Sequence, residues 1–232
     1  MPISDARPRR GKPLFWNGTL VHSRSFDALS LILPAGEAFL IDTLETWRTR
    51  CAMPIDTALD SEVQRFVREE RTHRQPHVRY NDVLITGLPE ARAVAERANR
   101  VTAELDKLSL QMKIALAAAF EHLTAVLSEE IDSHGILLAD GESHAAKLWR
   151  WHAREELRHR DVAIDVATRA GLSRGTLRFA LLLATAYLLS DLMRYTFALC
   201  LCDIRSGSIT RRAAAVDAAR FSLRSLPSLV RM

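Results

Sequence analysis

Glycine and proline are scarce in this chain, which has 9 and 8 of them among 232 residues. Folds built from short strands use these residues at their turns, so the scarcity argues against a loop-rich β fold. Strand-like alternation is weak, whereas leucine, alanine, arginine and glutamate, which favour helices, are frequent. With 48% hydrophobic and 26% charged residues, the composition is that of a globular protein, and we predict an all-α fold.

Cysteine is rarer still. The three cysteines, Cys51, Cys200 and Cys202, have a spacing that fits neither a zinc knuckle nor a redox-active pair. Free, reduced thiols are the simplest interpretation, and they favour a cytoplasmic protein. The first residues are basic and contain proline, with no apolar run behind them, so no signal peptide is expected.

Motifs of several common functions are absent. The chain has no HExxH, no GxSxG, no P-loop and no glycine-rich dinucleotide turn. The formal net charge of +4 is concentrated near the two ends, and elsewhere arginine is mixed with acidic residues as on a solvated helix face. Because nucleic-acid recognition motifs are also absent, we expect no nucleic-acid partner.

The predicted helices form a bundle between two appendages. Residues 1–25 are expected to form an irregular basic arm, 26–172 a helical bundle, and 173–232 apolar helices that pack on the bundle or at a dimer interface. Pro34 is expected to break the chain, and 81–87 to form a loop. The predicted helices cover about 36–51, 60–77, 89–104, 107–132, 142–170, 174–204 and 209–223.

One long apolar run extends from Phe179 to Cys202. Asp191 and Arg194 interrupt it on one helical face, where they can pair. A membrane span would have to bury both charges, at a cost of several kcal/mol. We therefore favour a core helix or the interface of a homodimer, and membrane association through 179–202 is the alternative.

Two segments carry the same pattern of metal-binding residue types. Glu70-x-x-His73 and Glu156-x-x-His159 both lie in predicted helices. Residues three apart are neighbours on a helical face, so each pair can bind one metal ion or bridge two. One such pair is a weak signal, and the alternative interpretation is a surface ion pair.

A single glutamate in apolar surroundings precedes each pair. These are Glu37, in PAGEAFLI, and Glu121, in ALAAAFEHLTAVL. The order along the chain is therefore Glu, ExxH, Glu, ExxH, which is the ligand order of ferritin-like carboxylate bundles with two metal ions. It predicts a four-helix core with extra C-terminal helices.

Electrostatics supports a metal centre. An isolated carboxylate such as Glu121 is costly to bury among alanine and leucine, and four inward glutamates repel one another. Two divalent cations would balance the four charges. Carboxylate oxygen and imidazole nitrogen suit iron, manganese or zinc, and we favour two iron ions.

Two further histidines share a helical face with the pairs. His77 follows His73 by four residues, and His152 precedes Glu156 by four. Each is predicted to act catalytically, as a proton-transfer group or an additional ligand near the metals. The alternative for both is a histidine at the surface or at a helix end.

These motifs resemble those of a known family. The matching pieces are Pro34-x-Gly36-Glu37-x-Phe39, Phe66-x-x-x-Glu70-x-x-His73-x-x-x-His77, Glu121-His122-x-Thr124, and Trp151-His152-x-x-Glu155-Glu156-x-x-His159-x-x-Val162-Ala163-x-Asp165. In them the chain is similar to bacterial proteins described as predicted metal-dependent hydrolases, of the ferritin-like class. The resemblance implies that Glu37, Glu70, His73, Glu121, Glu156 and His159 are metal ligands, with His77 and His152 close by.

Three functions remain open. A di-iron carboxylate bundle most naturally activates dioxygen, so we favour an oxidase or oxygenase that acts on a small apolar substrate, with the apolar helix as one wall of its pocket. The first alternative is a metal-dependent hydrolase that uses a metal-bridging hydroxide. The second is a non-catalytic helical protein that binds metal, a membrane or a partner.

Overall fold

The computed structural model describes residues 15–51, 55–134, 137–138, 142–158 and 160–219. All regular secondary structure in these ranges is helical, which confirms the all-α prediction. The elements are α1 (Leu20–Arg50), α2 (Thr57–Gly87), α3 (Glu90–Leu105), α4 (Leu110–Glu129), the π-helical turn η1 (Glu130–His134), α5 (His144–Glu156), α6 (Val162–Arg169) and α7 (Arg174–Arg205). A last helical stretch covers 211–219.

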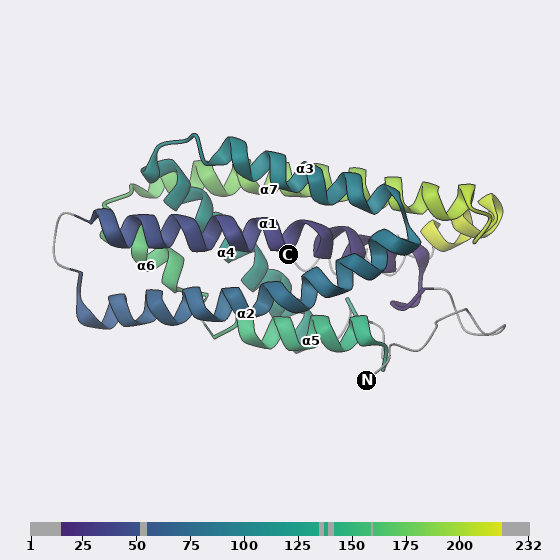
Figure 1. Cartoon of the computed structure of the whole chain (residues 1–232), viewed down its shortest axis with the longest axis horizontal. Helices are drawn as coiled ribbons and strands as arrows, with labels where there is room; N and C mark the ends of the chain where they lie inside the picture. The colour runs from purple at the N-terminus through teal and green to yellow at the C-terminus, as the bar shows by residue number, and fades with distance from the viewer. Residues whose placement is uncertain (1–14, 52–54, 135–136, 139–141, 159, 220–232) are drawn as a thin grey trace.

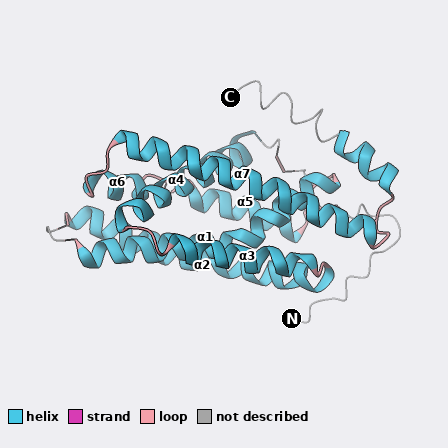
Figure 2. Ribbon diagram, turned by 90° about the horizontal axis from the view of Figure 1, so that it is seen from above, coloured by secondary structure: helices cyan, strands magenta, loops and turns pink. Residues whose placement is uncertain are grey.

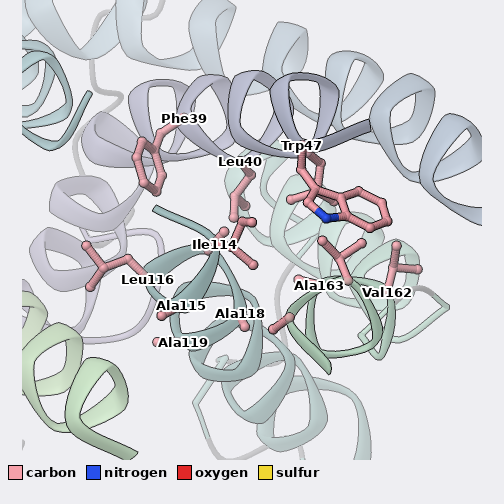
Figure 3. Close-up of a cluster of buried hydrophobic side chains, with 14 of the residues drawn as sticks. Phe39, Leu40, Trp47, Ile114, Ala115, Leu116, Ala118, Ala119, Val162 and Ala163 are labelled. Atoms are coloured by element: carbon pink, nitrogen blue, oxygen red, sulfur yellow. The ribbon is translucent and has the colours of Figure 1, made fainter. Parts of the chain in front are cut away.

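The long helices run along the long axis of the molecule, with α1 among the others (Figures 1 and 2). α1 packs against α2, α3, α4 and α7, while α5 and α6 both pack against α2 and α4. Buried aliphatic and aromatic side chains fill the space between α1, α4 and α6, where Trp47 lies near Val162 and Ala163 (Figure 3).

Helix α1 continues on both sides of Pro34, so the predicted chain break was wrong. Proline has no N–H, and at this position it frees the backbone carbonyl of Ser30, four residues earlier. The side chain of Asn81 donates a hydrogen bond of 2.7 Å to that carbonyl from α2. Residues 20–25, predicted as part of the irregular arm, are helical instead, because α1 begins at Leu20, where the Thr19 hydroxyl accepts from the N–H of His22.

Helix α2 continues to Gly87, so the predicted loop over 81–87 was wrong as well. Pro76 lies inside α2 and does not end it. Beyond the proline, His77 and Asn81 are buried on the side of α2 that faces α1, and both hydrogen bond to Ser30. These contacts between helices outweigh the local preference of proline to stop a helix.

The predicted single helix over 142–170 is in fact two helices, α5 and α6. The chain leaves helical geometry after Glu156 and resumes it at Val162. The sequence from 144 to 170 contains neither glycine nor proline, and its apolar spacing continues through the break. No local feature of the sequence marks this break, so periodicity alone does not reveal it.

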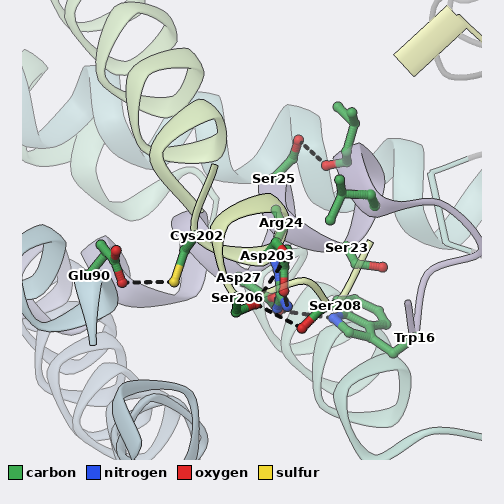
Figure 4. A network of polar contacts seen from close by, with 12 residues as sticks. Trp16, Ser23, Arg24, Ser25, Asp27, Glu90, Cys202, Asp203, Ser206 and Ser208 are labelled. Atoms are coloured by element: carbon green, nitrogen blue, oxygen red, sulfur yellow. Dashed lines mark hydrogen bonds and ion pairs between the residues drawn. The ribbon is translucent and has the colours of Figure 1, made fainter. Parts of the chain in front are cut away.

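Polar side chains join the start of α1 to the end of α7 (Figure 4). Arg24 binds Asp203 through its Nε at 2.6 Å and Asp27 through its Nη1 at 2.6 Å. Trp16 Nε1 donates to Asp27 at 2.9 Å, and the Tyr80 hydroxyl donates to the same carboxylate. These five residues are called the Arg24 network below.

Two helices are long and apolar enough to cross a membrane, by length and composition alone: Leu110–Asp132 and Arg174–Arg205. Half of the apolar window is buried in the first, against 17% in the second. The first is therefore a core helix, whereas α7 buries one side only. Its Asp191 and Arg194 form the predicted pair, at 3.2 Å. The outer face of α7 is exposed in the single chain, so of the two favoured interpretations a core helix describes only its inner side, and a dimer interface stays a prediction.

Candidate metal centre

Four helices bring the predicted carboxylates to one buried place. Glu37 comes from α1, Glu70 from α2, Glu121 from α4 and Glu156 from α5, and none is more than 3% exposed. All four line the same cavity. Each glutamate lies on the apolar side of its helix, so packing that side inward carries the carboxylate with it. These four side chains, with His73 and His152, are called the glutamate cluster below.

His73 lies between two of these carboxylates. Its Nδ1 is 3.4 Å from Glu70 Oε1 and 3.4 Å from Glu156 Oε1. The spacing of three residues places Glu70 and His73 on one face of α2, as the sequence predicts. The ring of Trp151 lies edge-on to His73, with 5.4 Å between ring centroids.

Glu156 has a histidine one turn before it on α5. His152 Nε2 lies 3.2 Å from Glu156 Oε1, so the i, i+4 spacing brings both side chains to the site. The predicted partner one turn later, His159, lies outside the described residues, and its role as a ligand stays a prediction. Because α5 ends at Glu156, the Glu156-x-x-His159 motif does not lie on one continuous helix as predicted.

Potential ligand atoms gather in two adjacent groups. In each group, three side chains offer atoms within 4.8 Å of one another. The groups are His73, His152 and Glu156, and Glu70, Glu121 and Glu156. Glu156 belongs to both. A carboxylate has two oxygens, so a shared glutamate can serve two neighbouring ions, as in di-metal carboxylate bundles.

Glu37 is a carboxylate buried between the helices. Neither of its oxygens has a hydrogen-bond partner among the described residues. Burial raises the pKa of Glu37 well above its usual value, and the nearby charges of Glu70 and Glu156 raise it further. A protein rarely buries such a group without compensation, and a bound cation would provide it.

The pKa values of Glu70, Glu121 and His73 are raised as well. Burial, followed by the charge of Glu156, raises the pKa of Glu70 to about 7. Burial and the charges of Glu156, Glu70 and Glu37 raise the pKa of Glu121 well above its usual value. For His73, burial acts to lower the pKa, but hydrogen bonds and charges from Glu156 and Glu70 outweigh it and raise the pKa to about 10. The cluster therefore holds protons wherever cations do not replace them.

A hydrogen-bond chain fixes the proton on His77. Ser30 Oγ lies 2.8 Å from His77 Nδ1 and 2.8 Å from Asn81 Oδ1. The Asn81 amide is oriented by its donation to the Ser30 carbonyl, so its Oδ1 accepts the single hydroxyl proton of Ser30. Ser30 Oγ then accepts from His77 Nδ1–H, which leaves the lone pair on Nε2. Burial, with the charges of His152 and His73, lowers the pKa of His77 well below its usual value, so the ring is neutral.

Both additional histidines lie at the cluster, as predicted from their helical faces. The rings of His77 and His152 are 4.8 Å apart between centroids, and those of His73 and His152 are 5.3 Å apart. Ser30 and Asn81 were not among the residues predicted from the sequence. The four-residue spacing from His77 to Asn81 is a signal that could have revealed Asn81, whereas Ser30 lies on another helix and has no such signal.

An apolar cavity of about 110 Å³ adjoins the glutamate cluster. Aliphatic and aromatic residues of α1, α3, α4 and α7 form most of its walls. Tyr187, Leu188, Asp191 and Tyr195 of α7 line the cavity, so the apolar helix forms one wall of a pocket beside the cluster, as predicted from the sequence. The arrangement suits a small apolar molecule held next to a metal centre.

Comparison with known proteins places the chain in a family. A family model described as "Predicted metal-dependent hydrolase" matches residues 6–231, nearly the whole sequence. A search of curated proteins finds no match. A search of solved structures finds none either. The family description favours the hydrolase alternative over the oxidase or oxygenase and agrees with the resemblance seen in the sequence. The chain belongs to the predicted metal-dependent hydrolase family.

Proposed function

We propose that this protein is a metal-dependent hydrolase that acts on a small, largely apolar ester or amide at a centre of two divalent ions. One observation carries the proposal: two adjacent groups of potential ligands share Glu156, beside the Glu37 carboxylate that has no hydrogen-bond partner among the described residues. The family description supports the hydrolytic reaction, and the apolar cavity supports the class of substrate.

The residues fit a pair of ions. The four glutamates carry four negative charges when ionised, and two divalent cations balance them. The proposed ligands are Glu37, Glu70, His73, Glu121, Glu156 and His159, with His152 as an additional ligand or proton-transfer group. This set of oxygen and nitrogen atoms suits iron, manganese or zinc. Such ions supply Lewis acidity and make water acidic enough to act as a nucleophile near neutral pH.

The chain's own groups would manage protons and substrate. His77 is buried, and Ser30 holds one side of its ring, so the Nε2 lone pair on the other side is available to accept a hydrogen bond from water or substrate. The apolar cavity walls would bind the apolar part of the substrate and exclude bulk water from the reacting group.

The test is hydrolysis under anaerobic conditions. Metal-free protein is reloaded with zinc, manganese or iron and assayed on a panel of esters and amides with apolar chains of increasing length. We expect metal-dependent turnover that falls more than about 100-fold in Glu70→Ala/His73→Ala, because that variant loses two ligands from one helical face. Turnover that needs dioxygen, or the absence of hydrolysis with every metal, would contradict the proposal.

An oxidase or oxygenase is the second candidate. The glutamate and histidine ligand set and the apolar cavity are equally suited to an iron pair that reacts with dioxygen. Oxygen consumption by the iron-loaded protein, coupled to loss of an apolar substrate, would favour it. Stoichiometric metal with neither reaction would favour the non-catalytic alternative.

A further inference from the structure

The outer face of α7 is an apolar stripe that the described part of the chain leaves uncovered. Of the ten large hydrophobic residues exposed among the described residues, six lie on this one helix. They are Phe179, Leu182, Leu183, Leu189, Met193 and Phe197. Leu182 is 72% exposed and Met193 is 68% exposed. Such a concentration of exposed apolar residues marks an interaction surface. These six residues are called the α7 stripe below.

The exposed charged residues of α7 itself are all basic. α7 carries four arginines, all exposed: Arg174, Arg178, Arg194 and Arg205. Its two acidic residues, Asp191 and Asp203, are buried. Asp191 accepts from Tyr195 and pairs with Arg194, and Asp203 binds Arg24, so three exposed arginines of α7 have no acidic partner on this helix. The neighbouring helix α3 has three acidic and three basic residues, so it does not change this balance.

We propose that the α7 stripe docks on an anionic lipid surface. The opposite side of α7 packs against α1 and α4, so lipid cannot surround the helix, and α7 would lie along the membrane instead of crossing it. From Phe179 to Phe197 the stripe is about 27 Å long at 1.5 Å per residue. Its apolar side chains would enter the boundary between headgroups and acyl chains, and the arginines beside it would bind lipid phosphates.

Charge argues against the other occupants of this face. Two copies of the chain that paired through the stripe would bring Arg174, Arg178 and Arg205 of each copy together, and α7 exposes no acidic residue that would balance them. The sequence from 220 to 232 has apolar residues but also three arginines and no acid, so it would not neutralise the face either. An anionic bilayer offers both an apolar interior and negative charge.

Docking would also bring the cavity close to lipid. Tyr187, Leu188 and Tyr195 line the cavity from the inner side of α7. A helix with its side chains is about 10 Å across, so the cavity would lie roughly one helix width from the membrane. If the proposed function holds, an apolar substrate would enter from the bilayer. The docking itself does not depend on the metal centre.

The experiment is vesicle flotation with the full chain. Phosphatidylcholine vesicles with and without phosphatidylglycerol are compared at low and high salt. We expect the protein to float with the anionic vesicles and less so at high salt. Phe179→Ser/Met193→Ser/Phe197→Ser should reduce the bound fraction more than about tenfold, because three large side chains no longer leave water. Arg174→Gln/Arg178→Gln should reduce binding to anionic vesicles alone.

Controls separate this result from misfolding and from the metal centre. Val83→Ser/Ile164→Ser removes two exposed apolar side chains from other helices and should float like the wild type. Circular dichroism reports whether each variant keeps its helices. Glu70→Ala/His73→Ala should bind vesicles normally even where hydrolysis is lost. A wild-type dimer in light scattering that ignores vesicles and is split by the stripe variant would overturn the proposal in favour of a second copy. A monomer that ignores vesicles would overturn it in favour of coverage by the chain itself.

Discussion

The Arg24 network and the glutamate cluster are both buried groups of charged side chains, but they differ in how charge is balanced. In the Arg24 network, one guanidinium lies between Asp27 and Asp203, and Trp16 and Tyr80 donate to Asp27. In the glutamate cluster, four carboxylates converge, and Glu37 has no hydrogen-bond partner among the described residues.

From this difference we infer that the Arg24 network is a structural site and the glutamate cluster a metal site. The Arg24 network supplies its own counter-charge and donors, so it joins α1, α2 and α7 without any ligand. Among the described residues, the glutamate cluster holds four carboxylates and two histidines, and burial raises the pKa values of Glu37, Glu70 and Glu121, which favours their protonated forms. A divalent cation can replace those protons, whereas it would have no role in the Arg24 network.

Removing the arginine should give the largest effect on stability. Arg24→Ala leaves Asp27 and Asp203 buried without their counter-charge, and we expect a loss of about 3–5 kcal/mol in the free energy of unfolding. Denaturant unfolding measures it. The matched control is Arg48→Ala, which breaks a partly exposed pair with Asp60 and should change stability little. Equal effects of the two variants would mean that the Arg24 network is not a structural centre.

Removing one glutamate of the cluster should instead increase the free energy of unfolding of the metal-free protein. Glu37→Gln keeps the shape of the side chain but removes a buried carboxylate, so the metal-free protein should gain roughly 1–2 kcal/mol at pH 8. The same substitution should weaken metal affinity more than about tenfold, because a ligand is lost. Thermal unfolding with and without metal measures both effects. A variant that loses stability in both states would show that Glu37 has a structural role.

The pH dependence of the metal-free protein should follow the raised pKa values. The pKa of Glu70 rises from 4.5 to about 7, and that of His73 rises from 6.5 to about 10. Folding therefore favours the protonated groups, and this stability is lost as pH rises through those values. The melting temperature without metal should fall between about pH 6.5 and pH 9, a range above the usual pKa of His77, whose shift has the opposite sign.

Bound metal should reverse the fall of the melting temperature with pH. Ligands must be deprotonated to bind, so added metal should stabilise the protein more at pH 9 than at pH 6.5. Differential scanning fluorimetry across this range, in chelator and in excess metal, shows both slopes. Parallel curves in the two conditions would contradict the assignment of the glutamate cluster as the metal site.

The smallest effect is expected from the support of His77. Ser30→Ala removes the acceptor for His77 Nδ1–H, so the ring can adopt the other tautomer and turn its protonated nitrogen toward the site. We expect kcat to fall about tenfold with little change in KM and a shift in the pH profile. Thr86→Ala, which removes a hydroxyl bonded only to a carbonyl of its own exposed helix face, is the control. An unchanged pH profile would mean that Ser30 contributes only to packing and does not fix the tautomer of His77.

Much of the glutamate cluster could be predicted from the sequence because its signals are local. Glu70 and His73 are three residues apart on one helix, and Glu37 and Glu121 lie in runs of apolar residues, so helical geometry alone turns them inward. His77 and His152 were found in the same way, from spacings of four. Helix boundaries at Gly87 and Arg205 depend on packing as well, and only the second was close to its predicted position.

The features that could not be predicted from the sequence depend on contacts between segments that are distant in the chain. α1 continues through Pro34, and Asn81 of α2 donates to the Ser30 carbonyl that the proline leaves free. No residue near Pro34 in the sequence indicates this contact. The helix break after Glu156 contains no glycine or proline, and the apolar spacing continues through it, so the sequence does not predict it. The wall that α7 contributes to the cavity was expected from its composition, but the choice of Tyr187 and Tyr195 follows from how α7 packs on α1 and α4.

The most direct test of the central claim is metal content. Elemental analysis of the wild type, Glu70→Ala/His73→Ala and Arg24→Ala, each grown with iron, manganese and zinc supplied, compares the two buried clusters in one measurement. We predict about two divalent ions per chain in the wild type and in folded Arg24→Ala, and loss of them in the double variant. Wild-type protein without stoichiometric metal, or a double variant that keeps its full content, would contradict the claim that the glutamate cluster is a metal centre.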